Sequence, residues 1–491
     1  MSANDDTHDK PGAETDAALQ TLRALLGDAQ VLTGADAAGH ETDWRRRYQG
    51  RALAVVRPGS TDEVAAVLRW CAAQQPPVAV VPQGGNTGLV GGGVPDGSGR
   101  QLVLSLARMN RVRGLDAANL SLTLEAGVVL QAAQSVADDA GLLFPLSLAA
   151  EGSCTVGGNL ASNAGGTQVL RFGNARELCL GLEVVTASGA VWSSLSGLRK
   201  DNTGYDLRDL FIGSEGTLGV ITAATFKLFP APRSVVTGWA HVASLDQAVA
   251  LLGRLRAGFD AELTAFETMG LPALRLTHRH FPDLAWPLPP GDDRGWAVLF
   301  ELSSPHPEDF IAARAEAVLG EALEAGEVDD LVIAQNRGQA AQLWRWRESI
   351  PTAQAHEGLN IKHDIGVPVS AIPAFVAAAD AALAALRPGL RHVAFGHLGD
   401  GNLHYNLQAP EGESGPAFLR EFEARANACV HDLVQAHGGT ISAEHGIGQL
   451  KRDELVARKP ATHLALMQAI KAALDPMGLL NPGKMLSAPG A

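Results

Sequence analysis

The distribution of glycine constrains this chain more than any other feature. The 54 glycines among 491 residues are concentrated in a few loops, and the stretches between them alternate between helical and strand-like patterns. A backbone without Cβ atoms can turn its N–H groups toward one point and can approach a bound ligand closely. We therefore expect an α+β protein that holds a ligand against glycine-rich loops. These loops lie at Gly84–Gly99, Gly152–Gly173, Gly213–Gly219, Gly396–Gly401 and Gly438–Gly448.

Length and local composition divide the chain into parts. A chain of 491 residues is too long for one compact core. Residues 1–16 carry five acids and one lysine without an apolar core, which predicts a short disordered tail and no targeting signal. Pro230 and Pro232 interrupt both helix and central strand. We therefore predict an α+β domain at 17–232, a second one at 233–450, and a helical C-terminal segment at 451–491.

Several stretches carry a clear secondary-structure signal. Thr61–Gln74 begins with a capping threonine, has acids in its first turn and repeats apolar residues at helical spacing. It leads into a short β-branched strand at Val78–Val81, directly before the first glycine loop. Further strands are predicted at Leu102–Leu104, Leu120–Leu124, Leu182–Val185, Ala190–Trp192, Trp296–Leu302 and Asn360–Ile365, and helices at Leu245–Leu255, Glu308–Ala325 and Thr462–Leu474.

Charge and cysteine content exclude several classes of function. A formal net charge of -14 argues against a nucleic-acid or anionic-membrane partner, so an anionic substrate must be bound by a local cluster of cations. The four cysteines are scattered without a CxxC pair. This predicts buried thiols in a reducing, cytoplasmic setting, with neither disulfides nor a thiolate metal site. No run approaches about eighteen uninterrupted apolar residues, so no membrane span is predicted.

Three of the glycine loops suit a ligand with a diphosphate and a planar part. The first, at 82–92, follows a strand and contains neither GxGxxG nor GxxxxGK[ST], so it lacks the Rossmann and P-loop signatures. Taken alone, it could be a plain glycine-rich turn. The second, at 152–166, is small and polar throughout, which we interpret as backbone lying against a planar ligand and not as part of a core. The third, at 213–222, leads into a strand.

A second pattern, rich in histidine, lies in the C-terminal half. In GHLGDGNLHYN (396–406), Asp400-Gly401 is a strong hairpin signal, and a turn there would pair His397 with His404 at a Cβ separation of ~5 Å. Two such imidazoles suit one divalent cation. Glu444 in SAEHGIG (442–448) is a candidate third ligand, which leaves His445 free to act as a base. A non-haem iron oxygenase could use such ligands too, but the glycine loops would then be unexplained.

Together these motifs resemble the flavoproteins of the vanillyl-alcohol-oxidase type, specifically their FAD-linked 2-hydroxy-acid dehydrogenases. Within that branch, DWRRRYQG (43–50), AFETMG (265–270) and LRKDNTGYDL (198–207) are most similar to D-2-hydroxyglutarate dehydrogenases. The resemblance extends from about residue 43 to 485. It implies an FAD-binding domain at 17–232, a substrate and metal domain at 233–450, and a C-terminal segment that returns toward the flavin.

The resemblance also implies which residues hold FAD. Some relatives attach the flavin covalently through a histidine in the first loop. Here Asn86 stands in that region, so we expect non-covalent FAD. Asn481, in the returning segment, is expected at the isoalloxazine. The other FAD contacts carried over are Gly84, Gly85, Asn86, Thr87, Gly88, Gly152, Ser153, Gly157, Asn159, Asn163, Gly165 and Ile221.

For the reaction centre, the resemblance implies zinc or a similar divalent ion bound by His397, His404 and Glu444, with His445 as the base. Arg347, Lys362 and Asn406 are the implied substrate contacts. The family pattern places a threonine four positions after Arg347, where this chain has Pro351. This departure concerns the contact to the distal carboxylate of the substrate.

The resemblance implies oxidation of a D-2-hydroxy acid to a 2-oxo acid, with hydride transfer to flavin N5. D-2-hydroxyglutarate is the first choice of substrate, and D-lactate is the alternative. A more distant alternative is a different function, that of a catalytically silent flavin-binding subunit of an oxidase complex. Because no nicotinamide fingerprint is present, we expect a protein or a quinone-linked carrier as acceptor. The resemblance implies electron-transferring flavoprotein as the protein acceptor. A homodimer is the expected assembly, although no motif specifies it.

Overall fold

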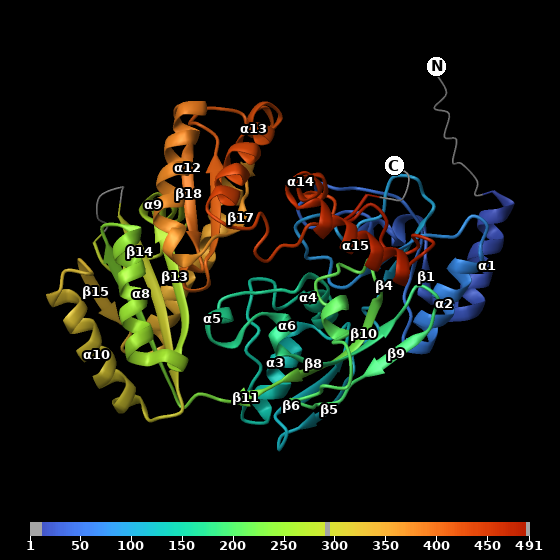
Figure 1. The fold of residues 1–491 in the computed structure, drawn as a ribbon, viewed down its shortest axis with the longest axis horizontal. Helices are drawn as coiled ribbons and strands as arrows, with labels where there is room; N and C mark the ends of the chain where they lie inside the picture. The colour runs from blue at the N-terminus through green and yellow to red at the C-terminus, as the bar shows by residue number, and fades with distance from the viewer. Residues whose placement is uncertain (1–11, 290–294, 488–491) are drawn as a thin grey trace.

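The computed structural model describes residues 12–289 and 295–487. Figure 1 shows two lobes joined by the chain that follows β11 (Phe229–Pro230). Helix α1 (Ala13–Leu26) begins within the predicted disordered tail, so that prediction is wrong for residues 13–16, while residues 1–11 lie outside the described residues. The acids Glu14 and Asp16 lie in the first turn of α1, where they stabilise the positive end of the helix.

The described part of the first lobe contains two main sheets. One has the order β1-β2-β4-β3, in which β2, β4 and β3 are parallel. The other is antiparallel, with the order β5-β6-β10-β8-β9. Their strands are β1 (Val31–Leu32), β2 (Ala52–Val56), β3 (Val80–Gln83), β4 (Gln101–Ser105), β5 (Val112–Asp116), β6 (Ser121–Glu125), β8 (Cys179–Val185), β9 (Val191–Ser194) and β10 (Val220–Lys227); β7 (Leu142–Leu143) pairs with β11.

Short helices connect these strands and border the glycine loops. The predicted first helix is α2 (Thr61–Ala73), but its N-cap is Ser60, whose hydroxyl accepts a hydrogen bond from Glu63 N, and not Thr61. The second glycine loop contains α4 (Val156–Ser162), and Val156 and Leu160 are fully buried in the core. Our interpretation that this stretch contributes no core is therefore wrong. The remaining helices here are α3 (Leu130–Asp139), α5 (Val169–Phe172), α6 (Ala175–Leu178) and α7 (Arg208–Phe211).

The second lobe is built on an antiparallel sheet with its own hydrophobic core. Its order is β15-β12-β14-β13-β18-β19-β16, and β17 also pairs with β19. The strands are β12 (Ser234–Val242), β13 (Leu263–Gly270), β14 (Trp296–Ser304), β15 (Asp330–Ile333), β16 (Asn360–Ile361), β17 (Asp364–Gly366), β18 (Arg391–Gly396) and β19 (Asn402–Gln408). The helices are α8 (Leu245–Phe259), α9 (Leu271–His280), α10 (Glu308–Glu324), α11 (Arg337–Glu357), α12 (Ile372–Leu386) and α13 (Gly415–Ala436).

In the structure, two features of this sheet differ from what the sequence predicted. The predicted strand at 360–365 is divided into β16 and β17, because His363 N donates to the side chain of Asn406. Both parts keep one register against β19, as the pairs Ile361↔Leu407 and Asp364↔His404 show. The predicted pairing of His397 with His404 is wrong: Phe395 lies opposite His404, because Leu398–Asp400 form a 3-10 turn in place of a two-residue turn.

Helix α12 and the turn before it form a long apolar segment of the second lobe. The segment Val369–Leu386 is long and apolar enough to cross a membrane by composition alone. Much of its apolar character comes from alanine, and Phe375 and Leu383 on its inner face are fully buried in the core of the second lobe. The absence of a membrane span therefore stays a prediction.

The C-terminal segment leaves the second lobe and packs against the first, where Figure 1 shows α14 (Arg452–Arg458) and α15 (Ala461–Leu474). Leu479 and Leu480 are buried in the core of the first lobe, and Val80 N donates to Leu479 O at 2.8 Å. Asp475 fixes this return: its carboxylate accepts from Leu479 N at 2.9 Å and Leu480 N at 2.7 Å, and it pairs with Lys471. The two separate cores support our proposed domain division at residue 232.

We predict that Asp475→Ala lowers the free energy of unfolding by about 3 kcal/mol, because it removes one partner of a buried ion pair and leaves two buried N–H groups without an acceptor. Urea denaturation of the holoprotein measures the effect. The control is Asp453→Ala, since that side chain is 83% exposed and pairs with Arg452 on the surface. Equal urea midpoints for the two variants would contradict this prediction.

Candidate active site

The three glycine loops of the first lobe enclose a common hollow. Most of the residues predicted to hold FAD line it, namely Gly84, Gly85, Asn86, Thr87, Gly88, Gly157, Asn159 and Ile221. The loops touch closely: a Cβ atom at Gly85 would lie 2.1 Å from the carbonyl oxygen of Ser153. At Gly88 a Cβ atom would meet no protein atom within 4 Å. The hollow is therefore bounded by backbone that only glycine permits, and it leaves open space beside that backbone.

The remaining predicted FAD residues have different surroundings. Gly152 and Ser153 form the turn before α4, and Ser153 N donates to Ala150 O. Asn163 ends α4 in the left-handed conformation and, with Gly165, lines a neighbouring cavity. Asn481 donates to Gly92 O and to Glu215 O, at 2.9 and 2.8 Å, so it joins the C-terminal segment to the first and third loops.

Two buried polar atoms indicate that the hollow is built for a polar ligand. Thr155 Oγ1 and Asn481 Oδ1 are buried and have no hydrogen-bond partner among the described residues. Thr155 lines the hollow directly. Buried hydroxyl and amide oxygens without a partner are costly, and a bound ligand with polar groups would remove that cost. The glycine backbone and these atoms fit the diphosphate and ring system of FAD.

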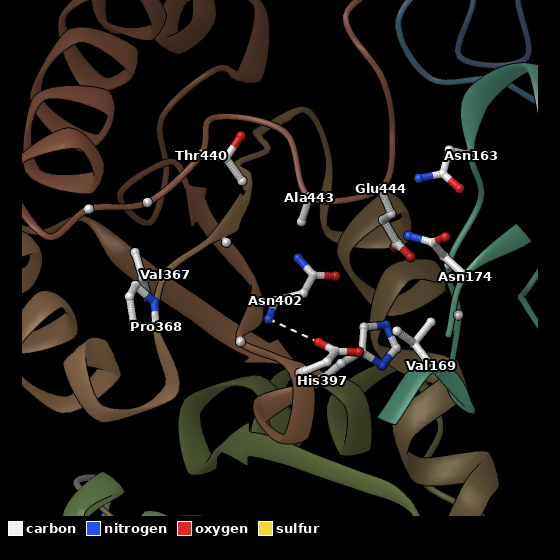
Figure 2. Close-up of a pocket in the computed structure, with 17 residues that line it drawn as sticks. Asn163, Val169, Asn174, Val367, Pro368, His397, Asn402, Thr440, Ala443 and Glu444 are labelled. Carbon is white, nitrogen blue, oxygen red and sulfur yellow. Dashed lines mark hydrogen bonds between the residues drawn. The ribbon is translucent and has the colours of Figure 1, made fainter. Parts of the chain in front are cut away.

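A second cavity, of about 520 Å³, lies between the lobes (Figure 2). Asn163 and Asn174 come from the first lobe, and His397, Asn402 and Glu444 come from the second. The cavity size is within the usual range for small-molecule sites. A substrate placed here would meet polar side chains from both lobes.

Imidazole and carboxylate groups converge beside this cavity. The possible ligand atoms of Asp364, His404, Glu444 and His445 all lie within 4.8 Å of one another. Glu444 Oε1 is 3.6 Å from His404 Nε2 and 3.7 Å from His445 Nε2. This set of nitrogen and oxygen donors is the kind that binds zinc and similar divalent ions.

Asp364 brings the parts of this cluster together. It lies directly opposite His404 in the β17–β19 ladder. Its Oδ2 accepts from Glu444 N at 3.1 Å and from His445 N at 2.8 Å, while its Oδ1 accepts from Asn402 Nδ2 at 2.9 Å. A strand pairing and a set of side-chain-to-backbone bonds thus place the predicted base beside the predicted ligands.

Burial controls the protonation of the cluster. It lowers the pKa of His445 to about 4, against the opposing charge of Asp364, and holds the pKa of His404 well below its usual value. Burial also raises the pKa of Glu444 to about 7. Both imidazoles are therefore neutral at pH 7, which is the form that accepts a proton or binds a metal ion.

His397 lies at the edge of the cluster and not within its tightest group. Its ring centroid is 5.5 Å from that of His404, and its Nδ1 lies 2.5 Å from Glu267 Oε1. Burial alone would lower the pKa of His397, but the Glu267 carboxylate outweighs burial and raises it to about 9. A histidine held by a carboxylate through one nitrogen presents the other to a metal, which is a common arrangement around metal ligands.

The predicted substrate residues are distributed around this cluster. Arg347 is almost fully buried, and its Nε donates to Glu267 Oε2 at 2.6 Å, so part of its charge is already neutralised. Asn406 Nδ2 donates to Gln354 Oε1 at 3.0 Å, and its Oδ1 accepts from His363 N. Burial, and then the nearby charge of Arg45, lower the pKa of Lys362 to about 8. Pro351 lies inside α11, where it cannot donate an N–H to the carbonyl of Arg347.

Sequence reasoning missed two acids that organise the site. Glu267, in the apolar strand β13, joins Arg347 to His397. Glu215 reaches from the third glycine loop and accepts from Ile447 N and Gly448 N, both at 2.6 Å. A charged residue within an apolar run was the available signal for Glu267, because a buried charge requires a partner. No comparable signal marked Glu215.

Comparison with known proteins places these features in a family. Residues 52–194 match the model for an FAD binding domain, and residues 231–485 match the C-terminal domain of FAD linked oxidases. The chain is 41% identical to the D-2-hydroxyglutarate dehydrogenase of Xanthomonas citri pv. viticola over 96% of this chain and 97% of that protein. This chain belongs to the FAD-linked oxidase family that includes the D-2-hydroxyglutarate dehydrogenases.

Other relatives agree with this assignment, and a solved structure has the same fold. The mitochondrial D-2-hydroxyglutarate dehydrogenase of Bos taurus is 39% identical over 90% of this chain and 78% of that protein. A D-2-hydroxyglutarate--pyruvate transhydrogenase of Saccharomyces cerevisiae is 33% identical over 95% of this chain and 94% of that protein. The structure of p-cresol methylhydroxylase superposes with a TM-score of 0.75 at 18% identity, over 97% of this chain and 98% of that one.

These findings confirm the family, the vanillyl-alcohol-oxidase-type fold, the use of FAD and the class of enzyme, an FAD-dependent dehydrogenase. The individual site residues, the metal, the homodimer and the cytoplasmic location stay predictions. Several of the relatives are named as mitochondrial proteins.

We predict that Gly85→Ala lowers FAD occupancy, because the new Cβ atom would overlap the carbonyl oxygen of Ser153 and separate the first two loops of this flavoprotein. The ratio of flavin to protein absorbance after purification, and FAD titration of the apoprotein, measure the loss. Gly97→Ala is the control, because Gly97 is exposed and a Cβ atom there meets nothing within 4 Å. Full flavin content in the Gly85 variant would disprove the proposed loop contact.

Proposed function

We propose that this protein oxidises D-2-hydroxyglutarate to 2-oxoglutarate, using non-covalent FAD and a divalent cation bound by His397, His404 and Glu444. The observation that carries the proposal is the position of His445. Its side chain lines the glycine hollow, and its Nε2 lies 3.7 Å from Glu444 Oε1. A base therefore stands between the flavin hollow and the donor cluster, where the hydroxyl-bearing carbon of a substrate would have to lie.

Some of these donors are proposed as ligands of the divalent cation, and one orients the base. Asp364 already accepts three N–H groups, and its Oδ2 lies 3.5 Å from His445 Nδ1, which favours an orienting role. His397 has one nitrogen held by Glu267, and a metal ion can bind the other once it displaces the proton that this imidazole carries at pH 7. His404 and Glu444 complete a set of two imidazoles and one carboxylate, which is usual for catalytic divalent ions.

The residues then act on the substrate in a simple order. When bound, FAD supplies a hydride acceptor and the divalent ion supplies Lewis acidity toward the hydroxyl and its neighbouring carboxylate. His445, neutral at pH 7, accepts the hydroxyl proton at Nε2, and Asp364 stabilises the imidazolium from the Nδ1 side. Loss of that proton and of the C2 hydride converts the alcohol to a 2-oxo acid, and the two electrons pass to an acceptor.

The identity of the substrate is supported by the names of the relatives. The bacterial, bovine and plant relatives are named for D-2-hydroxyglutarate. D-lactate is the alternative substrate, and a silent flavin subunit is disfavoured because the histidine and carboxylate donors are assembled. We propose electron-transferring flavoprotein or a quinone-linked carrier as acceptor. The yeast relative is named for pyruvate as well, so pyruvate belongs in the acceptor test.

We predict that D-2-hydroxyglutarate rapidly bleaches the visible flavin band under anaerobic conditions, and that its L form does not. Treatment with EDTA should abolish the bleaching and added divalent metal should restore it. Acid precipitation should release the flavin into the supernatant, since no covalent bond holds it. Electron-transferring flavoprotein, a quinone and pyruvate are then compared as reoxidants of the bleached enzyme.

Each failure of this experiment has a distinct meaning. Equal or faster bleaching by D-lactate would make D-lactate the substrate. Bleaching unaffected by EDTA would remove the metal from the proposal. If no 2-hydroxy acid bleaches the flavin, the proposed chemistry is wrong and the silent-subunit alternative stands.

We also predict that Asp364→Asn lowers turnover by about 10- to 100-fold, because the amide weakens the orientation of His445. The loss should appear in kcat more than in KM, since His445 acts on the bound substrate. Asp432→Asn is the control, because that carboxylate is 72% exposed and pairs with Arg458 on the surface. Normal turnover in the Asp364 variant, with unchanged metal content, would exclude the orienting role.

A further inference from the structure

The segment at 441–451 is held together by hydrogen bonds of its own. It contains the proposed metal ligand Glu444 and, next to it, the proposed base. Lys451 N donates to Ile447 O at 3.0 Å, and the buried ammonium of Lys451 donates to Ile441 O at 2.8 Å. These bonds join the two ends of the segment to its middle. A restraint on one part of the segment is therefore transmitted to the rest.

The same segment is bonded to the walls of the glycine hollow in the first lobe. The carboxylate of Glu215 accepts two backbone N–H groups of the segment, both at 2.6 Å. Gln449 donates from its backbone to Val90 O at 3.0 Å and from its side chain to Gly91 O at 2.9 Å. All three acceptor residues line the hollow that fits FAD. A ligand that orders these walls therefore also restrains the segment that carries the base.

The side chain of Glu444 also lies against the first lobe. A Cβ atom at Gly165, in the second glycine loop, would be 3.2 Å from Glu444 Oε2. Both residues line the cavity between the lobes, where Figure 2 shows the Glu444 side chain. On its other side, Glu444 Oε1 is 3.6 Å from His404 Nε2. The position of this carboxylate relative to the histidine of the second lobe thus depends on contacts with the FAD-binding lobe.

Among these links, Glu215 has an uncommon backbone conformation. Its φ of 52° lies in the left-handed region, which few residues other than glycine, asparagine and aspartate adopt. Hydrogen bonds hold this backbone on both sides, from Glu215 N to Ala161 O at 2.8 Å and from the side chain of Asn481 to Glu215 O at 2.8 Å. A Cβ atom at Gly446 would be 2.8 Å from Glu215 Oε1. A strained backbone that places a carboxylate directly beneath the segment indicates a task for that side chain.

We propose that Glu215 is a positioning residue that couples the binding of FAD to the binding of the divalent cation. The inference rests on the proposed function, because it takes Glu444 as a metal ligand, and it goes beyond that function by making the two binding events interdependent. FAD orders the walls of the hollow, Glu215 holds the segment against those walls, and the segment holds Glu444 beside His404. Such coupling is reciprocal, so the cation must raise the affinity for FAD by the factor by which FAD raises the affinity for the cation.

The test measures both affinities in the full-length protein and in Glu215→Gln. Zn²⁺ is titrated in competition with a chromophoric chelator, with and without saturating FAD, and FAD is titrated by flavin fluorescence in Zn²⁺ or in EDTA. In the unvaried protein, we expect each ligand to raise the affinity for the other about 10-fold. Because a glutamine amide turns an N–H toward N–H groups, Glu215→Gln should lower the Zn²⁺ affinity of the FAD-loaded protein about 10-fold. Its coupling factor should fall below about threefold.

Three further variants make this measurement specific. His404→Ala marks the site, since only the Zn²⁺ binding that it removes is compared. Gln449→Ala removes the bond to Gly91 O from a residue of the segment and not of the hollow walls, so it should reduce the coupling in part. Glu324→Gln, exposed at the end of α10, is the matched control and should change neither affinity. Tm reports folding, and a merely structural role of Glu215 would lower Tm without changing the coupling factor.

The outcomes separate this inference from the proposed function. If FAD and Zn²⁺ bind independently, or if Glu215→Gln leaves their coupling unchanged, the inference is overturned, while bleaching by D-2-hydroxyglutarate would still support the function. If the coupling requires Glu215 but no 2-hydroxy acid bleaches the flavin, the inference stands and the proposed function falls. If the FAD-loaded protein binds no Zn²⁺, the metal site and the inference both fall. Should the FAD-free protein not fold, the Zn²⁺ affinities of FAD-loaded Glu215→Gln and Glu324→Gln decide, and equal values overturn the inference.

Discussion

The buried carboxylate of Asp364 is the interaction on which the arrangement of this site depends. It belongs to a short strand of the second lobe, and it accepts hydrogen bonds from the backbone of Glu444 and His445 and from the side chain of Asn402. Burial opposes its ionisation, but the Lys451 ammonium and the protonated forms of His445 and His404, with His445 the largest contributor, hold the pKa of Asp364 well below its usual value. A permanently ionised acceptor inside the protein is strong, because little water competes for its hydrogen bonds.

The loop that carries Glu444 and His445 is also held from the first lobe. Glu215 accepts hydrogen bonds from Ile447 N and Gly448 N. The side chain of Asn481 donates to Glu215 O and to Gly92 O. The segment at 442–448 is therefore suspended between two acids, one from each lobe. This arrangement explains how a base on a loop of the second lobe can face a cofactor bound by the first. The reacting groups are positioned by backbone hydrogen bonds, which do not depend on the rotamers of long side chains.

The division of charge within the site follows from the same contacts. Burial acts to raise the pKa of Glu267, but His397 and Arg347 lower it to about 2, so one acid and two cations form a compact group behind the donor cluster.

Much of this protein was determined by local sequence. The glycine loops predicted a ligand-binding first lobe, since only glycine allows backbone such as Gly85 to pack against Ser153. The helical and strand periods predicted α2, α8, α10 and β14 within a few residues, and the motifs predicted the assembly of His404, Glu444 and His445. Tertiary structure alone decided the register of β18 against β19, the helix within the second glycine loop, and the contacts of Glu215 and Glu267. These features depend on contacts between residues far apart in the chain, such as Glu215 with Ile447, and periodicity and propensity carry no information about such contacts.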